Sequence, residues 1–479
     1  MTITRLIFWL GNSFLLCAAI LLLSLIASLL LLDVSMAFIF GGSAFFAALI
    51  GGILRLITQD TSTHETQIDA LVFLLLFWIC TPIFLAIPFW LSGATQSGVQ
   101  AYFEAVSAIT TTGASTLVPE SLPQSLLIYR SVIQFIGGVV TATFAVVILA
   151  ALNLGGTGVH ISKLFTLSRG DIFIRLIRIS RIVGLVYISL ASLCFVLMAV
   201  GGTSMFDALC LSLSAVSTGG FTPQSGQLTN YVGKFSIVVL AVTCVIGAAN
   251  IGVLSDILKR SSPNNKAIRH FFTNLEHRGL IAIIAILSVM GVFYSGAGES
   301  FNLIVEAAFM ASTAGFDYEV IGIDLLPPAL LIAVALIGGS AISTAGGIKI
   351  IRLILLMSHS ITDLDRMSHP SRVKLVHFKG QKLPDSMFLS IWMYFFGYTL
   401  VFAGGIIALA ASGISYDHAV ALSAAGLSNM GPLIGATFPE VTYGAMNQMQ
   451  LCIMTVIMLI GRVEVLAALA AFSPSLWRK

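Results

Sequence analysis

Charged side chains are scarce in this sequence. Asp, Glu, Lys and Arg together make up 9% of its 479 residues, whereas 57% of the residues are hydrophobic. Soluble domains carry about 25% charged residues, so the composition excludes an ordinary soluble protein and predicts a chain that lives among membrane lipids. We expect no nucleic-acid partner for such a chain.

Cysteine pairs and the motifs of common enzymes are also missing. The six cysteines fall in or beside apolar segments without the spacing of metal ligands, so we interpret them as small core residues. The sequence contains no HExxH, no nucleophile elbow and no Walker A motif, and GGTGVH at 155–160 does not fit the dinucleotide-binding fingerprint. We therefore expect neither an enzyme nor a cofactor held by this chain.

Long apolar runs are what the sequence has instead. Ten of them reach, or nearly reach, the roughly 20 residues that a helix needs to cross a bilayer. The first follows Arg5 as a signal peptide would, but it is about twice as long as a signal peptide's apolar region and lacks a cleavage site, so we expect a retained helix. The predicted spans are 6–32, 36–57, 70–91, 126–152, 182–200, 232–254, 280–294, 329–356, 387–411 and 446–472.

The basic residues predict the orientation, because Lys and Arg are retained on the cytoplasmic side of a membrane. They concentrate in three loops, at 163–181, 259–278 and 366–382, which we expect to be cytoplasmic together with both termini. The opposite face is acidic, which either concentrates cations or is simply the reciprocal of the positive-inside rule. The basic residues on this face are Arg130 and Lys234. Its acidic residues are Glu104, Glu120, Asp207, Glu299, Glu306, Asp317, Glu319, Asp324, Asp417 and Glu440.

A short polar motif recurs four times in the same setting. Its copies are SAITTTGAST (107–116), SAVSTGGFTP (214–223), MASTAGFDYE (310–319) and GLSNMGPLIG (426–435). Each copy follows a short apolar stretch, and a predicted span lies on either side. These stretches are too short to cross a bilayer and are predicted to be re-entrant half-helices, at 100–109, 206–216, 303–311 and 418–427.

This setting indicates what the motif can do. Irregular backbone is tolerated at membrane depth only where it is buried in protein or lines a water-filled cavity, which four copies around one axis would supply. The negative carbonyl end of each half-helix would face the motif. Glycine lets successive carbonyls turn inward, and a carbonyl ring replaces the hydration shell of K⁺. A single copy would more often be a helix C-cap or a small-residue packing face, but four matching copies favour a cation pathway.

Together with GGSAISTAGGIKIIRL (338–353), SNMGP (428–432) and IGRVEV followed by FSPSLWR, these repeats resemble the Trk/Ktr/HKT family of potassium transporters, most of all its bacterial TrkH-type membrane subunits. The resemblance implies an all-α polytopic membrane protein with four helix, pore half-helix, loop and helix repeats in pseudo-fourfold arrangement around one ion pore. The implied segments are 1–66 for two extra N-terminal helices, and 67–155, 156–260, 261–360 and 361–479 for the repeats.

The resemblance also implies a K⁺ selectivity filter at the four motifs, with one glycine from each. Ala314 and Met430 depart from the family's usual pattern, which leaves the fine selectivity open, and a sodium-permeable member of the same family is an alternative. The implied filter residues are Thr111, Thr112, Gly113, Thr218, Gly219, Gly220, Ser312, Thr313, Ala314, Gly315, Asn429, Met430 and Gly431.

Two features break the fourfold pattern. GGSAISTAGG at 338–347 puts four glycines inside the span 329–356, each weakening a helix by about 1 kcal/mol, and predicts a broken helix; a kinked, closely packed helix is the alternative. Arg462 is about 15 Å from the end of its predicted span, too deep for snorkelling, and Glu464 points to the opposite side of the helix.

The resemblance implies that both features control the pore. The family uses the first as an intramembrane gate and places the corresponding arginine near the pore below the filter, whereas a structural ion pair is the alternative for Arg462. The implied gate residues are Gly338, Gly339, Ser340, Ser343, Thr344, Gly346, Gly347 and Arg462.

The implied function is potassium uptake across a bacterial inner membrane, through a gated channel-like pore driven by the membrane potential, with K⁺ as the transported ion. The resemblance also implies a homodimer and a separate cytosolic, nucleotide-binding (TrkA-like) regulatory subunit that docks on the basic cytoplasmic loops. An ion-coupled transporter of an organic solute is the alternative from another class, although the repeats here are parallel and the acidic residues lie outside the spans.

Overall fold

The structure is a computed structural model, and the residues it describes are 3–58, 67–151, 172–254, 271–296, 300–318, 326–369, 377–378, 381–382 and 385–463. Within them every regular element is a helix apart from a two-residue antiparallel ladder between β1 (His377–Phe378) and β2 (Gln381–Lys382), so the predicted all-α fold is confirmed. The helices are α1 (Ile3–Leu30), α2 (Val34–Ile57), α3 (Gln67–Leu91), α4 (Gly98–Ile109), α5 (Gln124–Ala151), α6 (Ile172–Val200), α7 (Met205–Val216), α8 (Lys234–Ala248), α11 (Leu275–Ser295), α12 (Ser300–Ala311), α13 (Pro328–Ile337), α14 (Ile350–Ser368), α15 (Asp385–Ala411), α16 (Tyr416–Leu427), α17 (Leu433–Thr437) and α18 (Gln448–Val463).

Seven helices in the described part of the chain are long and apolar enough to cross a membrane: α1, α2, α3, α5, α6, α11 and α15. Most begin and end within a few residues of the predicted spans. The exception is α6, which begins at Ile172, so that Arg175, Arg178 and Arg181 lie in its first turns and not in the predicted loop. These arginines extend the helix beyond its apolar stretch, a length that hydropathy alone does not register.

Two predicted spans are not continuous helices. The span predicted at 329–356 is broken as expected, with α13 ending at Ile337 and α14 beginning at Ile350. The continuous span predicted at 232–254 is wrong, because α8 ends at Ala248. There the Asn250 N–H donates to His277 Nε2 at 3.0 Å, and the Asn250 side chain accepts the Gly252 N–H at 3.0 Å, so both groups are taken out of the helical hydrogen-bond pattern.

The last predicted span, 446–472, is only partly described. Its helix α18 is described as far as Val463, so Glu464 and the rest of the span lie outside the described residues. Among the loop residues used to predict orientation, Lys163, Arg169, Lys259, Arg260, Lys266, Arg269, Arg372, Lys374 and Lys379, with the acidic Glu299, Glu319 and Asp324, also lie outside them.

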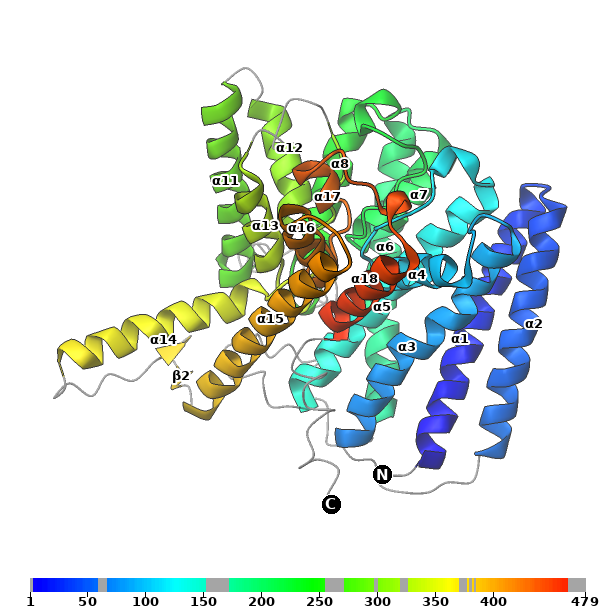
Figure 1. Cartoon of the computed structure of the whole chain (residues 1–479), viewed down its shortest axis with the longest axis horizontal. Coiled ribbons are helices and arrows are strands. Elements are labelled where there is room, and N and C mark those ends of the chain that lie inside the picture. Colours follow the sequence, from blue (N-terminus) through cyan, green and yellow to red (C-terminus); the bar gives the residue numbers. More distant parts are fainter. Residues whose placement is uncertain are drawn as a thin grey trace, which may run out of the picture.

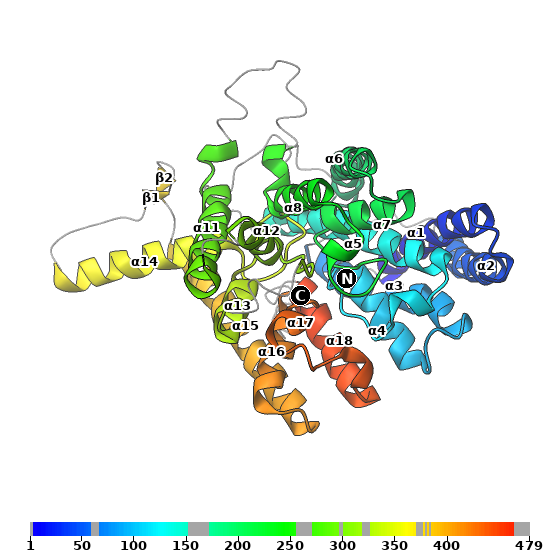
Figure 2. The same ribbon diagram turned by 90° about the horizontal axis from the view of Figure 1, so that it is seen from above.

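Four similar units surround one centre. Each consists of a long helix, a half-helix and a second helix: α3, α4, α5; α6, α7, α8; α11, α12, α13; and α15, α16, α18. The second helix of each unit packs on the half-helix of the next, in the pairs α5 with α7, α8 with α12, α13 with α16 and α18 with α4. The fourth pair closes the ring, which is visible from above in Figure 2. The pseudo-fourfold arrangement is therefore built from contacts between successive units.

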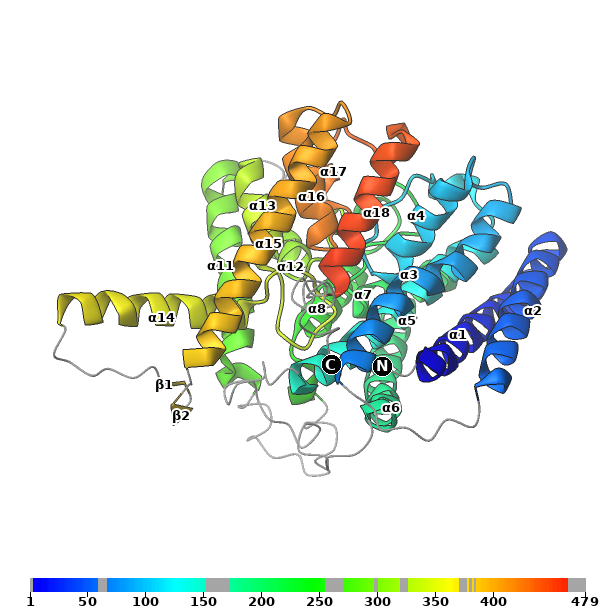
Figure 3. The ribbon, with the colours of Figure 1, turned by 60° about the horizontal axis from the view of Figure 1, so that its bottom comes forward.

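Two parts of the chain lie outside this ring. Helices α1 and α2 form a hairpin at one edge, where α1 packs on α3 and α5 (Figure 1). Asp33 joins this hairpin to α5 by accepting the Ser125 hydroxyl at 2.7 Å. On the other side α14 extends away from the body (Figure 3).

Candidate ion pathway

The four half-helices have the same length and end in the same hydrogen-bond pattern. Each has 12 residues. After α4, the Thr111 N–H donates to Ala108 O at 3.1 Å and the Thr112 N–H to Ser107 O at 2.9 Å. This pair of bonds is a Schellman cap. The same pair follows the other half-helices, at Thr218 and Gly219, Thr313 and Ala314, and Asn429 and Met430.

Each cap contains a residue with a positive φ, a conformation that costs a residue with a side chain about 1 kcal/mol or more. The angle lies between 49° and 59° at Thr111, Thr218, Thr313 and Asn429, two positions before each predicted filter glycine. It is positive again, between 64° and 76°, at Gly113, Gly220 and Gly315. This conformation belongs to the C′ position of a Schellman cap, and it recurs at the same position of all four copies.

The segments that follow the caps, which we call the candidate filter (111–113, 218–220, 312–315 and 429–431), touch one another in a ring. A Cβ on Gly113 would lie closer than 3.0 Å to the carbonyl oxygen of Gly219, and one on Gly220 as close to that of Ala314. At Gly315 the nearest atom would be Met430 Cε, at 3.0 Å. The ring brings together all thirteen predicted filter residues.

The fourth copy closes the ring differently. Gly431 is not among the residues of positive φ in the described chain, unlike the other three predicted filter glycines. It is nevertheless crowded, because a Cβ there would lie closer than 3.0 Å to the backbone of Ala114. Its N–H donates to Thr112 O at 2.6 Å, which links the fourth segment to the first.

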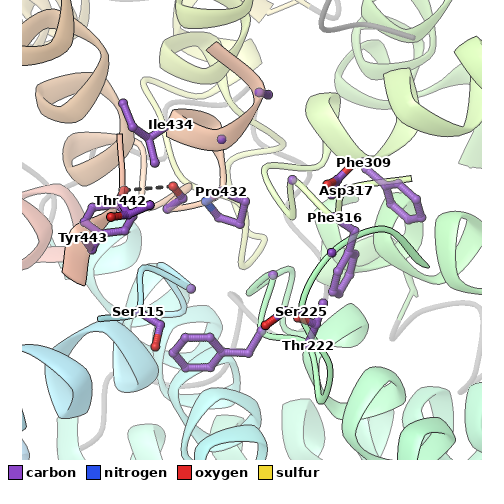
Figure 4. Close-up of a pocket in the computed structure, with 18 of the residues that line it drawn as sticks. Ser115, Thr222, Ser225, Phe309, Phe316, Asp317, Pro432, Ile434, Thr442 and Tyr443 are labelled. Atoms are coloured by element: carbon purple, nitrogen blue, oxygen red, sulfur yellow. Dashed lines mark hydrogen bonds between the residues drawn. The ribbon is translucent and has the colours of Figure 1, made fainter. Parts of the chain in front are cut away.

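A cavity of about 470 Å³ opens on one side of the candidate filter. All four glycines line it, together with residues from the loops that follow them (Figure 4). Two acidic residues, Glu306 and Asp317, and one basic residue, Arg130, line it. Burial raises the pKa of Asp317 above its ordinary value. An entrance of this kind attracts cations.

Three acidic residues of the predicted outer face are in fact buried within the half-helices. Glu104, Asp207 and Glu306 are at most 8% exposed. The Asp207 side chain accepts hydrogen bonds from Ser204 and Gln224, at 2.7 and 3.1 Å. These three side chains are thus not exposed, although Glu306 still lines the cavity.

The glycine-rich segment 338–347, which we call the gate loop, lies against the other side of the candidate filter. All its residues are buried. The Thr218 hydroxyl donates to Thr344 Oγ1 at 3.0 Å, and the Gly346 N–H donates to Thr313 Oγ1 at 3.1 Å. A Cβ on Gly346 would overlap the Ser428 carbonyl oxygen, so only glycine fits there. The gate loop therefore hydrogen-bonds to two of the four filter segments and packs against Ser428, the residue before the fourth.

The gate loop is held from the far side by the broken end of α8 and by α11. The Ser340 N–H donates to Ala248 O at 3.1 Å, and the Ile251 N–H donates to Ile342 O at 2.9 Å. The Ala341 N–H donates to a carboxylate oxygen of Glu276, 3% exposed, at 3.0 Å. Within the loop, Ser343 Oγ donates to Ser340 O at 2.7 Å. The two helix breaks thus supply each other's missing backbone partners.

Arg462 joins the gate loop to the candidate filter. Its guanidinium donates to Thr344 O at 2.7 Å and to Thr111 Oγ1 at 2.6 Å, and the residue is 7% exposed. With this contact, the fourth repeat's second helix places a positive charge directly beneath the first filter segment. The remaining predicted gate residues, Gly338, Gly339 and Gly347, form the turn that makes this approach possible, and Gly338 and Gly347 have φ of 71° and 79°.

Sequence reasoning missed several residues of this region. Lys349, with φ of 80°, follows the gate loop, and its Nζ donates to the Ala345 and Ser343 carbonyls. Lys349 and Arg462 line one small cavity of about 30 Å³. The sequence did carry a signal for Lys349, because a lysine inside a predicted span marks a candidate functional site by default. Glu276 gave no such signal, because it lies at the edge of a basic loop.

Comparison with known proteins agrees with this architecture. A family model for TrkH, described as a cation transport protein, matches residues 36–479. The Trk system potassium uptake protein TrkH of Escherichia coli (strain K12) is 29% identical over 448 residues, covering 91% of this chain and 91% of the relative. TrkG of the same strain is 30% identical, with 90% and 89% covered.

A solved structure has the same fold along its whole length. The crystal structure of the potassium transporter TrkH from Vibrio parahaemolyticus superimposes with a TM-score of 0.87 at 25% identity, covering 100% of both chains. The described chain is accordingly a multi-pass membrane protein, and the matched family is one of transporters and not of enzymes. On the family match and on this shared fold, the chain belongs to the TrkH family of cation transport proteins.

Proposed function

We propose that this protein takes up K⁺ through the centre of the ring of four repeats. The observation that carries the proposal is the candidate filter itself, four strained, glycine-containing segments in mutual contact at the ends of four half-helices. Backbone carbonyls in such a ring can replace the hydration shell of K⁺. The names of the relatives, which are potassium uptake proteins, support K⁺ as the ion.

The gate loop and Arg462 close this pathway. Both lie directly against the candidate filter on the side opposite the cavity, and Arg462 adds a buried positive charge that opposes a cation. Opening then requires the loop to leave the Thr218 and Thr313 side chains and the Arg462 guanidinium. A loop of small residues can shift between two such positions within a packed pore.

Transport is driven by the ion gradient and the membrane potential, which supplies about 2.3 kcal/mol per charge per 100 mV. The protein lies in the bacterial inner membrane with both termini in the cytoplasm, as a homodimer, and its basic loops dock a cytosolic, nucleotide-binding subunit of the TrkA type. These parts of the proposal rest on the distribution of basic residues and on membership of a Trk family.

The test is ion uptake into proteoliposomes that contain only this chain. Rubidium, as a K⁺ substitute, should enter, sodium should enter much more slowly, and organic solutes should not enter. Equal sodium and rubidium uptake would identify the sodium-permeable alternative, and solute uptake would identify a secondary transporter.

The gate is tested by removing residues 340–345. This change leaves every residue of the candidate filter in place, so the ratio of rubidium to sodium uptake should persist while flux without the regulatory subunit rises. The flux should also lose its response to nucleotide when that subunit is present. A shortened protein that folds but stays closed without the subunit would mean that the loop is not the gate.

A further inference from the structure

Two buried polar side chains lie one helical turn apart on α5, outside the candidate filter and the gate loop. Arg130 is 2% exposed and Gln134 is 0% exposed. Residues at i and i+4 share one face of a helix, and this face points toward the loops of repeats 1 and 2. A buried arginine in a spanning helix is a candidate for a functional role.

Arg130 connects the segments that follow the filter glycines of two repeats. One terminal nitrogen donates to Ser115 Oγ of repeat 1 at 3.2 Å, and the other donates to Thr222 O of repeat 2 at 3.2 Å. The guanidinium also lies 4.7 Å from the ring centre of Phe221. The two bonds use two separate nitrogens of one planar group, which arginine has and lysine lacks.

Gln134 reaches the candidate filter itself. Its amide nitrogen donates to Gly219 O at 2.7 Å. That oxygen is the one that a Cβ on Gly113 would strike, so the amide fixes the carbonyl at the junction between the first two filter segments. A Cβ on Gly219 would itself lie closer than 3.0 Å to Gln134. The Gly219 backbone is therefore packed closely against both Gly113 and Gln134.

Glu104 anchors the repeat 1 end of the bridge. Its carboxylate accepts the Thr116 N–H at 2.6 Å, the Thr116 hydroxyl at 2.8 Å and the Ser115 hydroxyl at 3.1 Å. The Ser115 hydroxyl thus donates to Glu104 and accepts from Arg130. Because Glu104 belongs to the half-helix α4, the bridge runs from α4 through Ser115 and Arg130 to repeat 2.

We propose that Arg130 and Gln134 are positioning residues that hold the repeat 2 filter segment in register with that of repeat 1, and so set the preference for K⁺ over Na⁺. The inference rests on the proposed filter. The two ions are separated by the geometry and number of the carbonyls around them. Without the Gln134 donor the Gly219 carbonyl is free to rotate, and without the Arg130 fork the two post-filter loops lose their shared support.

The test compares Gln134→Met and Arg130→Lys with wild type in proteoliposomes. Methionine has similar length but no N–H, and lysine keeps the charge but has a single nitrogen in place of arginine's planar two-nitrogen fork. Lys234→Ala is the control, because Lys234 is an exposed basic residue at the start of α8, the counterpart of α5 in the second repeat. Gly113→Ser, a direct change to the candidate filter, is the fourth variant.

The rubidium to sodium uptake ratio should fall about fivefold in Gln134→Met and in Arg130→Lys, the factor that corresponds to one hydrogen bond. Thermal unfolding of both variants should stay close to wild type, and Lys234→Ala should keep the wild-type ratio. An unchanged ratio in Gln134→Met together with a lowered ratio in Gly113→Ser would overturn this inference and leave the filter intact. Unchanged ratios in both would overturn the filter and this inference together. Gln134→Met decides the matter if Arg130→Lys does not fold.

Discussion

Replacing Arg462 by methionine should open the pore. The arginine donates one hydrogen bond to Thr344 O of the gate loop and one to Thr111 Oγ1 of the candidate filter, so it ties the loop to the filter. Methionine is unbranched and fills the same space without charge or donors. The substitution therefore removes both bonds and the positive charge that opposes a cation.

The size of the effect follows from the bond to Thr344 O, which is lost when the gate loop moves. A hydrogen bond to a charged group contributes about 1.5 to 3 kcal/mol. Since about 1.4 kcal/mol is a factor of ten, the closed to open ratio should fall by about 10- to 100-fold. Thr111→Val removes only the bond to the threonine hydroxyl, which does not involve the gate loop, and should change the ratio much less.

The assay is rubidium uptake into proteoliposomes at matched protein content and without the regulatory subunit. Arg55→Met is the matched control, since Arg55 is an exposed arginine on α2, far from the candidate filter in the sequence and outside the ring. The double variant Thr111→Val with Arg462→Met should show no more flux than Arg462→Met alone, because both remove the same bond. Wild-type flux in a well-folded Arg462→Met protein would refute the reasoning and favour a purely structural arginine.

Three further changes test other parts of the pathway. Gly113→Ser should lower the rubidium to sodium ratio, because a side chain there meets the Gly219 carbonyl and φ is 75°; matched uptake assays measure it. Burial raises the pKa of Asp317, so lowering the external pH below that pKa should protonate its carboxylate, remove negative charge from the entrance and reduce flux. A pH series of uptake assays measures this dependence, and Asp317→Asn should abolish it. Glu276→Ala should raise unregulated flux about tenfold, because the Ala341 N–H loses its acceptor.

Each of these has an outcome that contradicts it. A Gly113→Ser protein with the wild-type ratio would place the filter elsewhere. A pH dependence that survives in Asp317→Asn would assign it to another group. Glu276→Gln keeps an acceptor oxygen and is the control for the third change, so equal flux in Glu276→Ala and Glu276→Gln would show that this anchor does not hold the gate loop.

The sequence was sufficient to predict the number and place of the half-helices. Four short apolar stretches with a matching polar motif define them, and the predicted starts lie within three residues of those observed, as at Ser300 against 303. It also predicted the break within 329–356. Both are local features, set by how many apolar residues occur in a row and by how poorly glycine supports a helix.

The end of α8 could not be predicted in this way. Nothing in the apolar run 232–254 marks a stop, and the helix ends at Ala248 because Asn250 finds partners in His277 and Glu276, on a different helix. The burial of Glu104 has a similar origin, since its carboxylate is satisfied by Thr116, twelve residues away and beyond the candidate filter. A contact formed by packing overrides the local pattern in each case.

By itself, then, the sequence determined that the chain crosses a membrane, that it is built from four repeats, and which residues form the motif after each half-helix, because these depend on composition and on short-range order. Tertiary structure decided which motif follows which around the ring, that the gate loop lies against the threonines, and that Arg462 of the last helix meets Thr111 of the first repeat, 351 positions away. Such a pairing depends on where whole helices pack, and short-range sequence patterns carry no record of it.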